Sequence, residues 1–197
     1  MDAAPRRMST EARREQLLAF GRQHFAEHGY EAMSMDAIAQ RAGVSKGLFY
    51  HYFGNQRAFY METVRSVTDE LIEITEPPAD RAFGDAFQAM VTAFVGYVAH
   101  NGGIYTALVR GGLGSDDEVN ALLDRVRVIS MDRILERLGI ERPSELSRLS
   151  IYGWVSFVEN ASAEWTSKRD VSTHQLVDLF IAAFAPVFDI LQRERCS

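Results

Sequence analysis

The sequence predicts an all-α protein with a small N-terminal three-helix domain and a larger second domain, with about nine helices in total. Apolar residues recur at helical spacing nearly throughout, strand-like alternation is absent, and glycines, prolines and polar clusters separate the runs. We expect residues 1–9 to form a flexible arm, residues 10–54 the first domain and residues 55–197 the second.

The first domain is expected to contain one long helix and two short ones. The long helix runs from about Thr10 to His28, and Gly29 ends it. Ser34 and Ser45 begin the two short helices, because a serine hydroxyl can accept a hydrogen bond from a backbone N–H group of the first turn. One face of the long helix is predicted to carry Leu17, Leu18, Gly21, Phe25 and His28.

The second domain is expected to begin with a long helix and to contain five further helical runs. Asn55 caps the long helix, which ends near Thr75 before Pro77 and Pro78. Pro186 lies inside the last run and is expected to kink that helix or to end it early. The runs cover residues 83–100, 104–110, 117–138, 144–167 and 173–192, with Ser115 or Asp116, Gly139 and Ser144 at their boundaries.

The charge is unevenly spread along the chain. The 197 residues carry a formal net charge of −6, with 21 Lys and Arg against 27 Asp and Glu, whereas the first 60 residues hold eight against six. This asymmetry indicates a small cationic module on an acidic body. The single cysteine, Cys196, fits a reducing compartment, and we see no signal sequence and no uninterrupted bilayer-length apolar run. We therefore expect a soluble, cytoplasmic protein with no membrane partner.

The most informative stretch is a helix, a turn and a second helix within residues 34–53. Ala39 lets the two backbones approach and Gly43 supplies the tight turn. This arrangement is a helix-turn-helix, which presents the first turn of its second helix, residues 45–47, to a DNA groove. The side chains expected to fill the angle between the helices are Ile38, Val44 and Phe49.

The second helix ends in five ring-bearing residues, 49–53. We expect Phe49 and Phe53 to point inward, which leaves the other three rings near the surface, where they can hydrogen-bond phosphate oxygens. The alternative is that all five rings form the core of a small helical unit. The turn, the caps and the local basic excess favour the DNA interpretation.

Residues 29–60, GYEAMSMDAIAQRAGVSKGLFYHYFGNQRAFY, resemble the DNA-binding signature of the tetracycline-repressor (TetR) family. The resemblance implies a dimeric transcriptional regulator, usually a repressor, that a small molecule releases from a near-palindromic operator in double-stranded DNA. The implied switch is a ligand that moves the helix after residue 55 and so changes the spacing of the two recognition helices. The residues assigned to DNA binding are Ser34, Ser45, Lys46, Gly47, Leu48, Tyr50, His51, Tyr52 and Arg57.

The chain departs from the family pattern at three positions. The family commonly has a small polar residue where this chain has Leu48, so that contact becomes apolar, as with a thymine methyl. A lysine is usual at the position of Gln56, and the neighbouring Arg57 can substitute for its charge. His24 stands where the family prefers an aliphatic residue.

Two other patterns suggest chemistry that their surroundings do not support. HFAEH, residues 24–28, matches a zinc-peptidase pattern but lacks a third ligand, so a hydrogen-bonded core histidine is the preferred interpretation of His24. RGGLGSDD, residues 110–117, follows no strand and lacks the G-K-[ST] ending of a phosphate loop. Arg6 and Arg7 are interpreted as part of a disordered tail rather than as a minor-groove arm.

The second domain is expected to hold a small, mainly hydrophobic effector with one or two polar groups. Glu159 and Asn160 fall in an otherwise apolar helix, where burial would require a partner. The alternative is that the polar candidates face solvent or the dimer interface. The predicted ligand-binding residues are Phe94, Tyr97, His100, Asn101, Tyr105, Arg110, Trp154, Phe157, Glu159 and Asn160.

The last two helices predict a homodimer. The final helix carries a wide apolar stripe, wider than one core needs, and a two-fold four-helix bundle would cover it. Two recognition helices about 34–36 Å apart would then read a near-palindrome. The stripe consists of Leu176, Leu179, Phe180, Ala183, Phe184, Val187 and Leu191.

Two rival interpretations remain. We find no nucleophile–base pair, metal set or cofactor loop in the sequence, so we expect neither an enzyme nor a cofactor. A helical ligand-binding or interaction domain without DNA binding is the other rival, and Gln56 and the net acidity keep it open.

Overall fold

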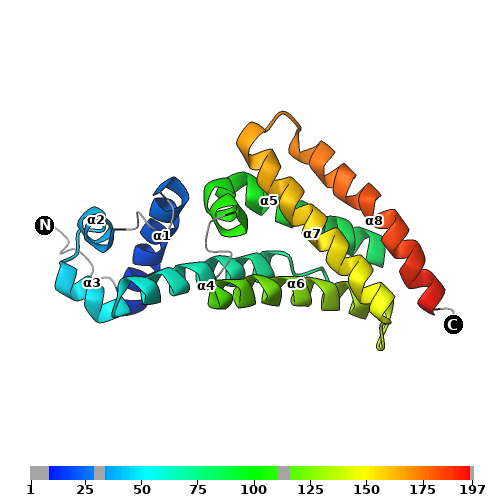
Figure 1. Cartoon of the computed structure of the whole chain (residues 1–197), viewed down its shortest axis with the longest axis horizontal. Coiled ribbons are helices and arrows are strands. Elements are labelled where there is room, and N and C mark those ends of the chain that lie inside the picture. Colours follow the sequence, from blue (N-terminus) through cyan, green and yellow to red (C-terminus); the bar gives the residue numbers. More distant parts are fainter. Residues whose placement is uncertain (1–8, 29–33, 111–115, 196–197) are drawn as a thin grey trace, which may run out of the picture. The chain divides into compact units, whose positions relative to one another are not determined.

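The computed structural model describes residues 9–28, 34–110 and 116–195, and these residues form an all-helical fold without strands (Figure 1). The predicted fold class is therefore confirmed. The helices are α1 (Thr10–His28), α2 (Met35–Arg41), α3 (Lys46–Phe53), α4 (Gln56–Ile74), α5 (Phe83–Arg110), α6 (Asp117–Leu138), α7 (Glu145–Lys168) and α8 (Thr173–Arg195).

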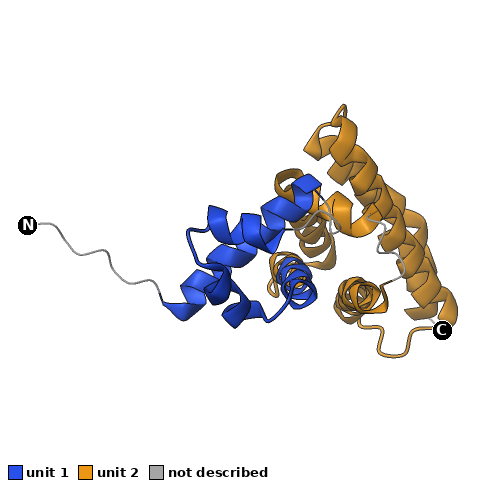
Figure 2. Cartoon of the chain, turned by 60° about the vertical axis from the view of Figure 1, so that its left-hand side comes forward, with its two compact units in different colours: residues 1–67 blue, residues 68–197 orange. Residues whose placement is uncertain are grey.

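The chain divides into two compact units, Met1–Val67 and Thr68–Ser197 (Figure 2). The sequence-based domain boundary lies at residues 54 and 55, whereas the first unit of the structure extends to Val67, inside α4. Gly29 and residues 1–8 of the predicted arm, which include Arg6 and Arg7, lie outside the described residues.

The core of the N-terminal unit is built from aromatic rings of α1, α3 and α4. Phe25 packs edge-on against Tyr60, with ring centroids 5.2 Å apart. Of the residues predicted to share one face of α1, Leu17, Leu18, Gly21 and Phe25 are buried, whereas His28 is exposed. It lies in the last turn of α1, where its Nδ1 atom is 3.1 Å from the carbonyl oxygen of His24.

The helix caps follow the local sequence. The Ser34, Ser45 and Ser144 side chains each accept a hydrogen bond from the backbone N–H three residues later. Asn55 and Asp116 do the same for α4 and α6. Gly139 ends α6 in the left-handed conformation, with φ of 68°, which glycine adopts without strain. These predicted boundaries are confirmed, whereas Ser115 lies outside the described residues.

In the C-terminal unit, α5, α7 and α8 pack against one another and α6 packs against α5 and α7. Figure 1 shows α7 and α8 side by side and antiparallel. Trp154 lies at the centre of this core, in ring contact with Phe87 and Phe184, and its indole N–H donates to the carbonyl oxygen of Phe180 at 3.0 Å.

The runs predicted at residues 83–100 and 104–110 meet in one element, α5, which is kinked at Asn101, inside the break that the sequence predicts. With this pair counted as one element, the described residues form eight helices, close to the expected nine. Asn101 alone departs from helical geometry, with φ of −112° and ψ of 23°, and its side-chain amide donates to the carbonyl oxygen of Tyr97. The helix resumes at Gly102, where a Cβ atom would lie 3.0 Å from Cγ2 of Thr166. The joint is therefore a kink held by close packing rather than a loop.

Of the two effects expected of Pro186, an early end of the helix is excluded, because α8 continues through Pro186 to Arg195. Pro186 and Ala182 are exposed, so the Ala182 carbonyl that loses its helical partner can bond to water. Within the described part of the chain, α8 is the one helix whose length and composition would allow it to cross a membrane. Since α8 packs against α5 and α7, we interpret it as a helix of the bundle.

The apolar stripe predicted for the dimer is largely internal. Leu176, Phe180, Phe184 and Leu191 are buried in the unit's own core, because α8 packs against both α5 and α7. The unit's own core therefore covers more of the stripe than expected, and Leu179 is the large apolar residue of the stripe that stays exposed. The exposed apolar face, which we call the α7–α8 face, consists of Leu146, Leu149, Tyr152 and Phe157 on α7 and Leu179 on α8.

Candidate functional site

The helix-turn-helix is closed by backbone hydrogen bonds around Gly43. The N–H group of Val44 donates to the carbonyl oxygen of Ala39 at 3.0 Å, and that of Gly43 donates to Gln40 at 3.1 Å. Gly43 has φ of 66°, a conformation that residues with a Cβ atom rarely adopt. This three-residue turn fixes the direction in which α3 leaves α2.

Buried rings brace α3 from behind, as predicted. Phe49 and Phe53 are almost fully buried and pack against Phe59 of α4, with ring centroids 4.9 and 4.7 Å apart. The guanidinium of Arg14 on α1 lies over the Phe53 ring, 5.2 Å from its centroid. These contacts hold α3 on one side only, so its other side is free to meet a ligand.

The outer side of α3 carries the predicted DNA-binding residues. Lys46, Gly47, Leu48, Tyr50 and His51 are exposed, and Leu48 retains 40% of its accessible surface. A Cβ atom added to Gly47 would meet no other atom within 4 Å, so the first turn is open. Three further candidates, Ser34, Ser45 and Arg57, are also exposed, and Tyr52 is half-buried.

Lys46 is not free in this surface. Its ammonium group donates to the carboxylate of Asp36 on α2 at 2.9 Å and lies 5.9 Å from the centroid of the Tyr50 ring. This hydrogen bond, which the Asp36 carboxylate accepts, raises the pKa of Lys46. Both partners are exposed, which leaves the pair open to exchange with another anion.

His24 and His28 stack with ring centroids 4.4 Å apart, and Nε2 of His24 accepts a hydrogen bond from the Ser34 N–H group. His24 is half-buried rather than a core residue, so this part of the preferred interpretation was wrong. Among the described residues, no group of three or more His, Cys, Asp or Glu side chains is placed to hold a metal ion.

The structure does not gather the predicted ligand-binding residues into one site. Tyr97, Tyr105 and Trp154 are buried, and Trp154 belongs to the central core. Phe94, Asn101 and Glu159 are half-buried, whereas His100, Arg110, Phe157 and Asn160 are exposed. Arg110 forms an ion pair with Glu164 on the surface of α7.

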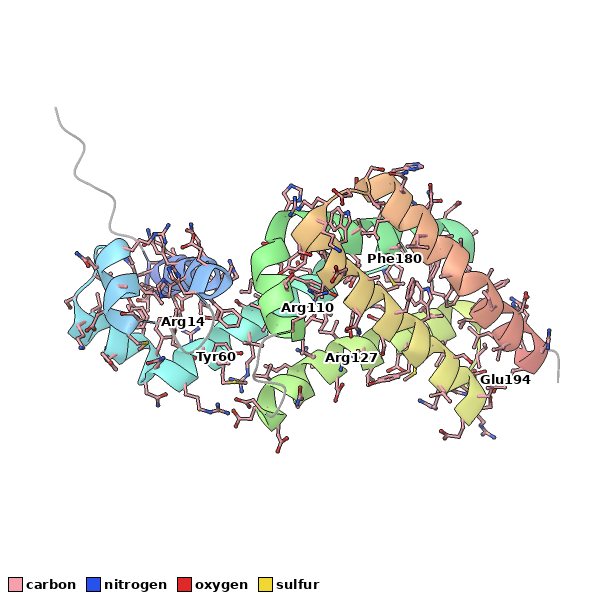
Figure 3. All side chains as sticks on the ribbon, turned by 45° about the horizontal axis from the view of Figure 1, so that its top comes forward. Arg14, Tyr60, Arg110, Arg127, Phe180 and Glu194 are labelled. Atoms are coloured by element: carbon pink, nitrogen blue, oxygen red, sulfur yellow. The ribbon has the colours of Figure 1, made fainter. Side chains whose placement is uncertain are left out.

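Two of these candidates do meet, together with a residue that the sequence analysis missed. Arg127 of α6 (Figure 3) donates from Nε to the Glu159 carboxylate at 2.8 Å, and the Tyr105 hydroxyl donates to the Glu159 carbonyl oxygen at 3.3 Å. Burial raises the pKa of Glu159, against the opposing effect of Arg127, and burial also raises the pKa of Tyr105. We call these three residues the Arg127 cluster.

A signal for Arg127 was present in the sequence. Arg127 falls at helical spacing with Leu123, Met131 and Ile134, and a charged residue on an apolar stripe requires a buried partner. Which residue supplies that partner depends on how α6 packs against α7, and helical spacing alone does not give this.

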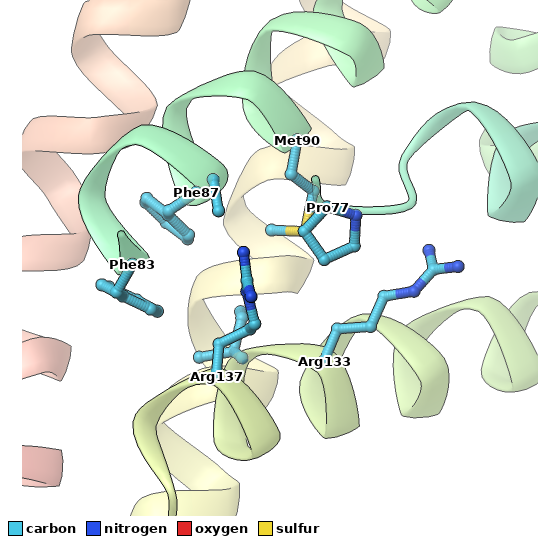
Figure 4. A pocket seen from close by; sticks show the side chains of 8 residues that line it. Pro77, Phe83, Phe87, Met90, Arg133 and Arg137 are labelled. Carbon is cyan, nitrogen blue, oxygen red and sulfur yellow. The ribbon is translucent and has the colours of Figure 1, made fainter. Parts of the chain in front are cut away.

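The C-terminal unit also contains a small pocket among α5, α6 and the segment before α5. In Figure 4, Phe83, Phe87 and Met90 approach it from α5, and Arg133 and Arg137 from α6. Pro77, Ala86 and Ile134 complete its lining, so the pocket is mainly apolar. None of the predicted ligand-binding residues lines it.

The two arginines of this pocket tie α6 to the end of α4. Arg133 donates to the carbonyl oxygen of Ile72 at 2.9 Å and forms an ion pair with Glu76. Arg137 donates to the carbonyl oxygens of Ala79 at 3.0 Å, of Arg81 at 3.1 Å, and of Pro78. Since α6 also carries Arg127, one helix contacts both the polar cluster and the C-terminal end of α4.

Comparison with known families gives two matches that together cover most of the chain. Residues 17–63 match the family described as bacterial regulatory proteins, tetR family. Residues 83–187 match the tetracyclin repressor-like C-terminal domain. The first match contains the whole helix-turn-helix, and the second contains α5 to α7 and most of α8.

Curated relatives and solved structures agree with these matches. The chain is 26% identical to the HTH-type transcriptional activator FasR of Mycolicibacterium smegmatis, over 81% of this chain and 74% of FasR. It is 31% identical to the regulator BetI of Vibrio parahaemolyticus, over 60% of this chain and 61% of BetI. A tetR-family regulator from Streptomyces coelicolor superposes with a TM-score of 0.85 at 26% identity, covering 95% of this chain and 85% of that one.

A more distant solved structure shares the fold. It is the regulator FadR of Bacillus subtilis, in complex with stearoyl-CoA, with a TM-score of 0.68 at 17% identity, covering 88% of this chain and 96% of FadR.

Proposed function

The chain belongs to the TetR family and is a helix-turn-helix transcriptional regulator, and from this premise we propose that it is a cytoplasmic homodimer that represses transcription from a near-palindromic operator. The exposed first turn of α3, braced by Phe49 and Phe53, is the observation that carries the DNA-binding part of the proposal. An α-helix supported on one side and open on the other can enter a major groove.

Each residue predicted to bind DNA has a proposed role. Lys46 binds a phosphate oxygen or a base edge. The hydroxyl groups of Tyr50 and Tyr52 donate hydrogen bonds to phosphate oxygens, and His51 reaches a phosphate or a base. Leu48 contacts a thymine methyl, for which its exposed side chain is suited. Ser34, Ser45, Gly47 and Arg57 complete the interface, with Ser34 capping α2 beside the backbone and Arg57 supplying the charge that Gln56 lacks.

The proposed dimer forms through the α7–α8 face. Leu149 retains 68% of its accessible surface and Leu146 retains 60%, which are high values for leucines on a regular helix. Neighbouring apolar side chains exposed on two adjacent helices are typical of a protein interface. A two-fold pairing of α7 and α8 would cover them and would bring two copies of α3 to one operator.

The proposed effector is a mainly apolar molecule with a polar group, and the polar group interacts with the Arg127 cluster. The cluster supplies a guanidinium, a carboxylate and a phenol in a half-buried setting, which suits a ligand with few polar atoms. Stearoyl-CoA, the ligand named for FadR of B. subtilis, has a long apolar acyl chain attached to a charged nucleotide-containing group, and is a first probe for the apolar part of the site. A thermal-shift screen that finds stabilisation only by highly charged, sugar-like compounds would contradict the proposal.

The proposed switch acts through α6. A ligand that displaces Glu159 from Arg127 would shift α6, and Arg133 would pass that shift to the end of α4. The ligand changes operator affinity only if it binds the two arrangements unequally. Equal operator affinity with and without saturating effector would contradict this mechanism.

Footprinting of the recombinant protein on the DNA upstream of its own gene tests the proposed function. We expect one protected near-palindrome, with binding that weakens steeply as salt rises. Lys46→Ala and Tyr50→Ala should remove the footprint while far-UV circular dichroism stays unchanged. If the protein shows neither salt-dependent DNA binding nor a preferred site, the result would instead support the rival interpretation, a ligand-binding domain that does not bind DNA.

A further inference from the structure

The helix-turn-helix and the start of α4, residues 34–61, form what we call the DNA-reading surface, and an acidic residue there would be repelled by DNA. Between residues 34 and 61, Asp36 is the one Asp or Glu, whereas Arg41, Lys46 and Arg57 supply positive charge. The Asp36 carboxylate lies on the other helix of the motif and accepts a hydrogen bond from the Lys46 ammonium at 2.9 Å. The single acid of this stretch is thus paired with the lysine at the exposed first turn of α3.

A phosphate group that approaches Lys46 must compete with this carboxylate. Lys46 and Asp36 each keep 62% of their side-chain surface exposed, so water and DNA reach both. If Lys46 turns to the phosphate, the hydrogen bond to Asp36 is lost. Asp36 is then left exposed beside the negatively charged backbone and is repelled by it. Both effects weaken DNA binding, and neither depends on base sequence.

We propose that Asp36 is an affinity-lowering residue of the DNA-reading surface, because its carboxylate occupies Lys46 in the free protein and repels phosphates in the complex. This inference rests on the proposed DNA-binding function. Non-specific affinity comes almost entirely from phosphate contacts, so a carboxylate at this position restrains attachment to DNA of any sequence. Leu48 and Tyr50 are exposed on the same helix and carry no charge, so their own contacts with DNA are not part of this competition.

The test compares Asp36→Asn with Glu15→Gln, which removes one negative charge from an exposed position on α1 of the same unit. Fluorescence anisotropy with a random-sequence duplex of about 24 base pairs, between 50 and 200 mM KCl, gives affinity and salt dependence. We expect Asp36→Asn to bind about two- to fivefold more tightly at the lowest salt, the range of one exposed ion pair. Its slope of log affinity against log salt should steepen by up to about 0.9.

A third and a fourth variant separate the ion pair from net charge. In the Lys46→Gln background, Asp36→Asn should gain much less affinity than it does beside Lys46, because the competition has been removed. The inference is overturned if Asp36→Asn equals Glu15→Gln, or if its gain is as large without Lys46. A wild-type protein that shows no salt-dependent DNA binding would overturn the proposed function as well, whereas binding without the Asp36 effect overturns this inference alone. Thermal unfolding checks that each variant remains folded.

Discussion

Replacing Arg127 with methionine tests whether the Arg127 cluster stabilises the C-terminal unit. Methionine keeps most of the volume of the side chain but leaves the Glu159 carboxylate without its guanidinium. The Glu159 side chain is only 12% exposed and that of Arg127 21%. Removing one partner of a buried pair costs about 3–5 kcal/mol, and since both groups keep some contact with water we expect about 2–3 kcal/mol at pH 7.5.

The loss should depend on pH in a defined direction. Burial already raises the pKa of Glu159 above its usual value, and removing Arg127 raises it further. The folded variant therefore binds this proton more tightly than the unfolded chain. Its stability relative to wild type recovers as pH falls through the folded pKa toward the unfolded value. Each unit of additional pKa rise corresponds to about 1.4 kcal/mol, so the loss should be smaller at pH 5 than at pH 7.5.

Urea unfolding followed by tryptophan fluorescence measures this loss in the relevant unit. Both tryptophans of the chain, Trp154 and Trp165, are buried in the C-terminal unit, so the signal reports on it. Protein concentration is held constant, because a dimer gains stability with concentration. The double variant Arg127→Met, Glu159→Gln is the control and should lose the pH dependence. A loss below about 0.5 kcal/mol, or an equal loss at pH 7.5 and pH 5, would refute the reasoning.

Three other predictions concern packing, acid stability and assembly. Gly21→Ala should destabilise the N-terminal unit by about 1–3 kcal/mol in urea unfolding followed by circular dichroism, because its Cβ atom would lie 2.4 Å from the Phe59 ring. The matched Gly47→Ala, with no neighbour within 4 Å, should stabilise α3 by up to about 1 kcal/mol and weaken operator binding in anisotropy measurements. Glu194→Gln should lower the melting temperature at pH 7, because hydrogen bonds from Ser147 and Ser144 lower the pKa of Glu194. That contribution is present above the unfolded pKa and is lost as pH falls through the folded pKa. The difference in melting temperature between wild type and variant should therefore shrink as pH is lowered, and a constant difference would contradict it. Leu149→Arg should convert dimer to monomer in analytical ultracentrifugation, whereas Val128→Arg, at an exposed apolar residue of α6, should not. If both variants stay dimeric, the α7–α8 face is not the dimer interface.

The parts of the fold that the sequence predicts well depend on local interactions. Ser34, Ser45 and Ser144 each bond to a backbone N–H three residues away, so the signal and the structure lie within one turn. The inward direction of Phe49 and Phe53 follows in the same way from helical spacing. These features can be predicted without knowing where the other helices lie.

The remaining parts depend on contacts between helices far apart in sequence. The width of the stripe on α8 did not reveal that two neighbouring helices, α5 and α7, cover most of it. Continuity of α5 past Asn101 depends on the fit of Gly102 against Thr166, more than sixty residues away. The Arg127–Glu159 pair joins α6 to α7 in the same way.

The boundary between the two units falls inside α4, between Val67 and Thr68, and not in a loop. An α-helix turns by about 100° per residue, so inserting one residue here would rotate everything that follows about the helix axis by that angle. Insertions of seven residues, close to two full turns, would restore the phase and displace one unit from the other by about 10 Å. Lengthening of this chain during evolution should therefore be tolerated here only in near-integral helical turns.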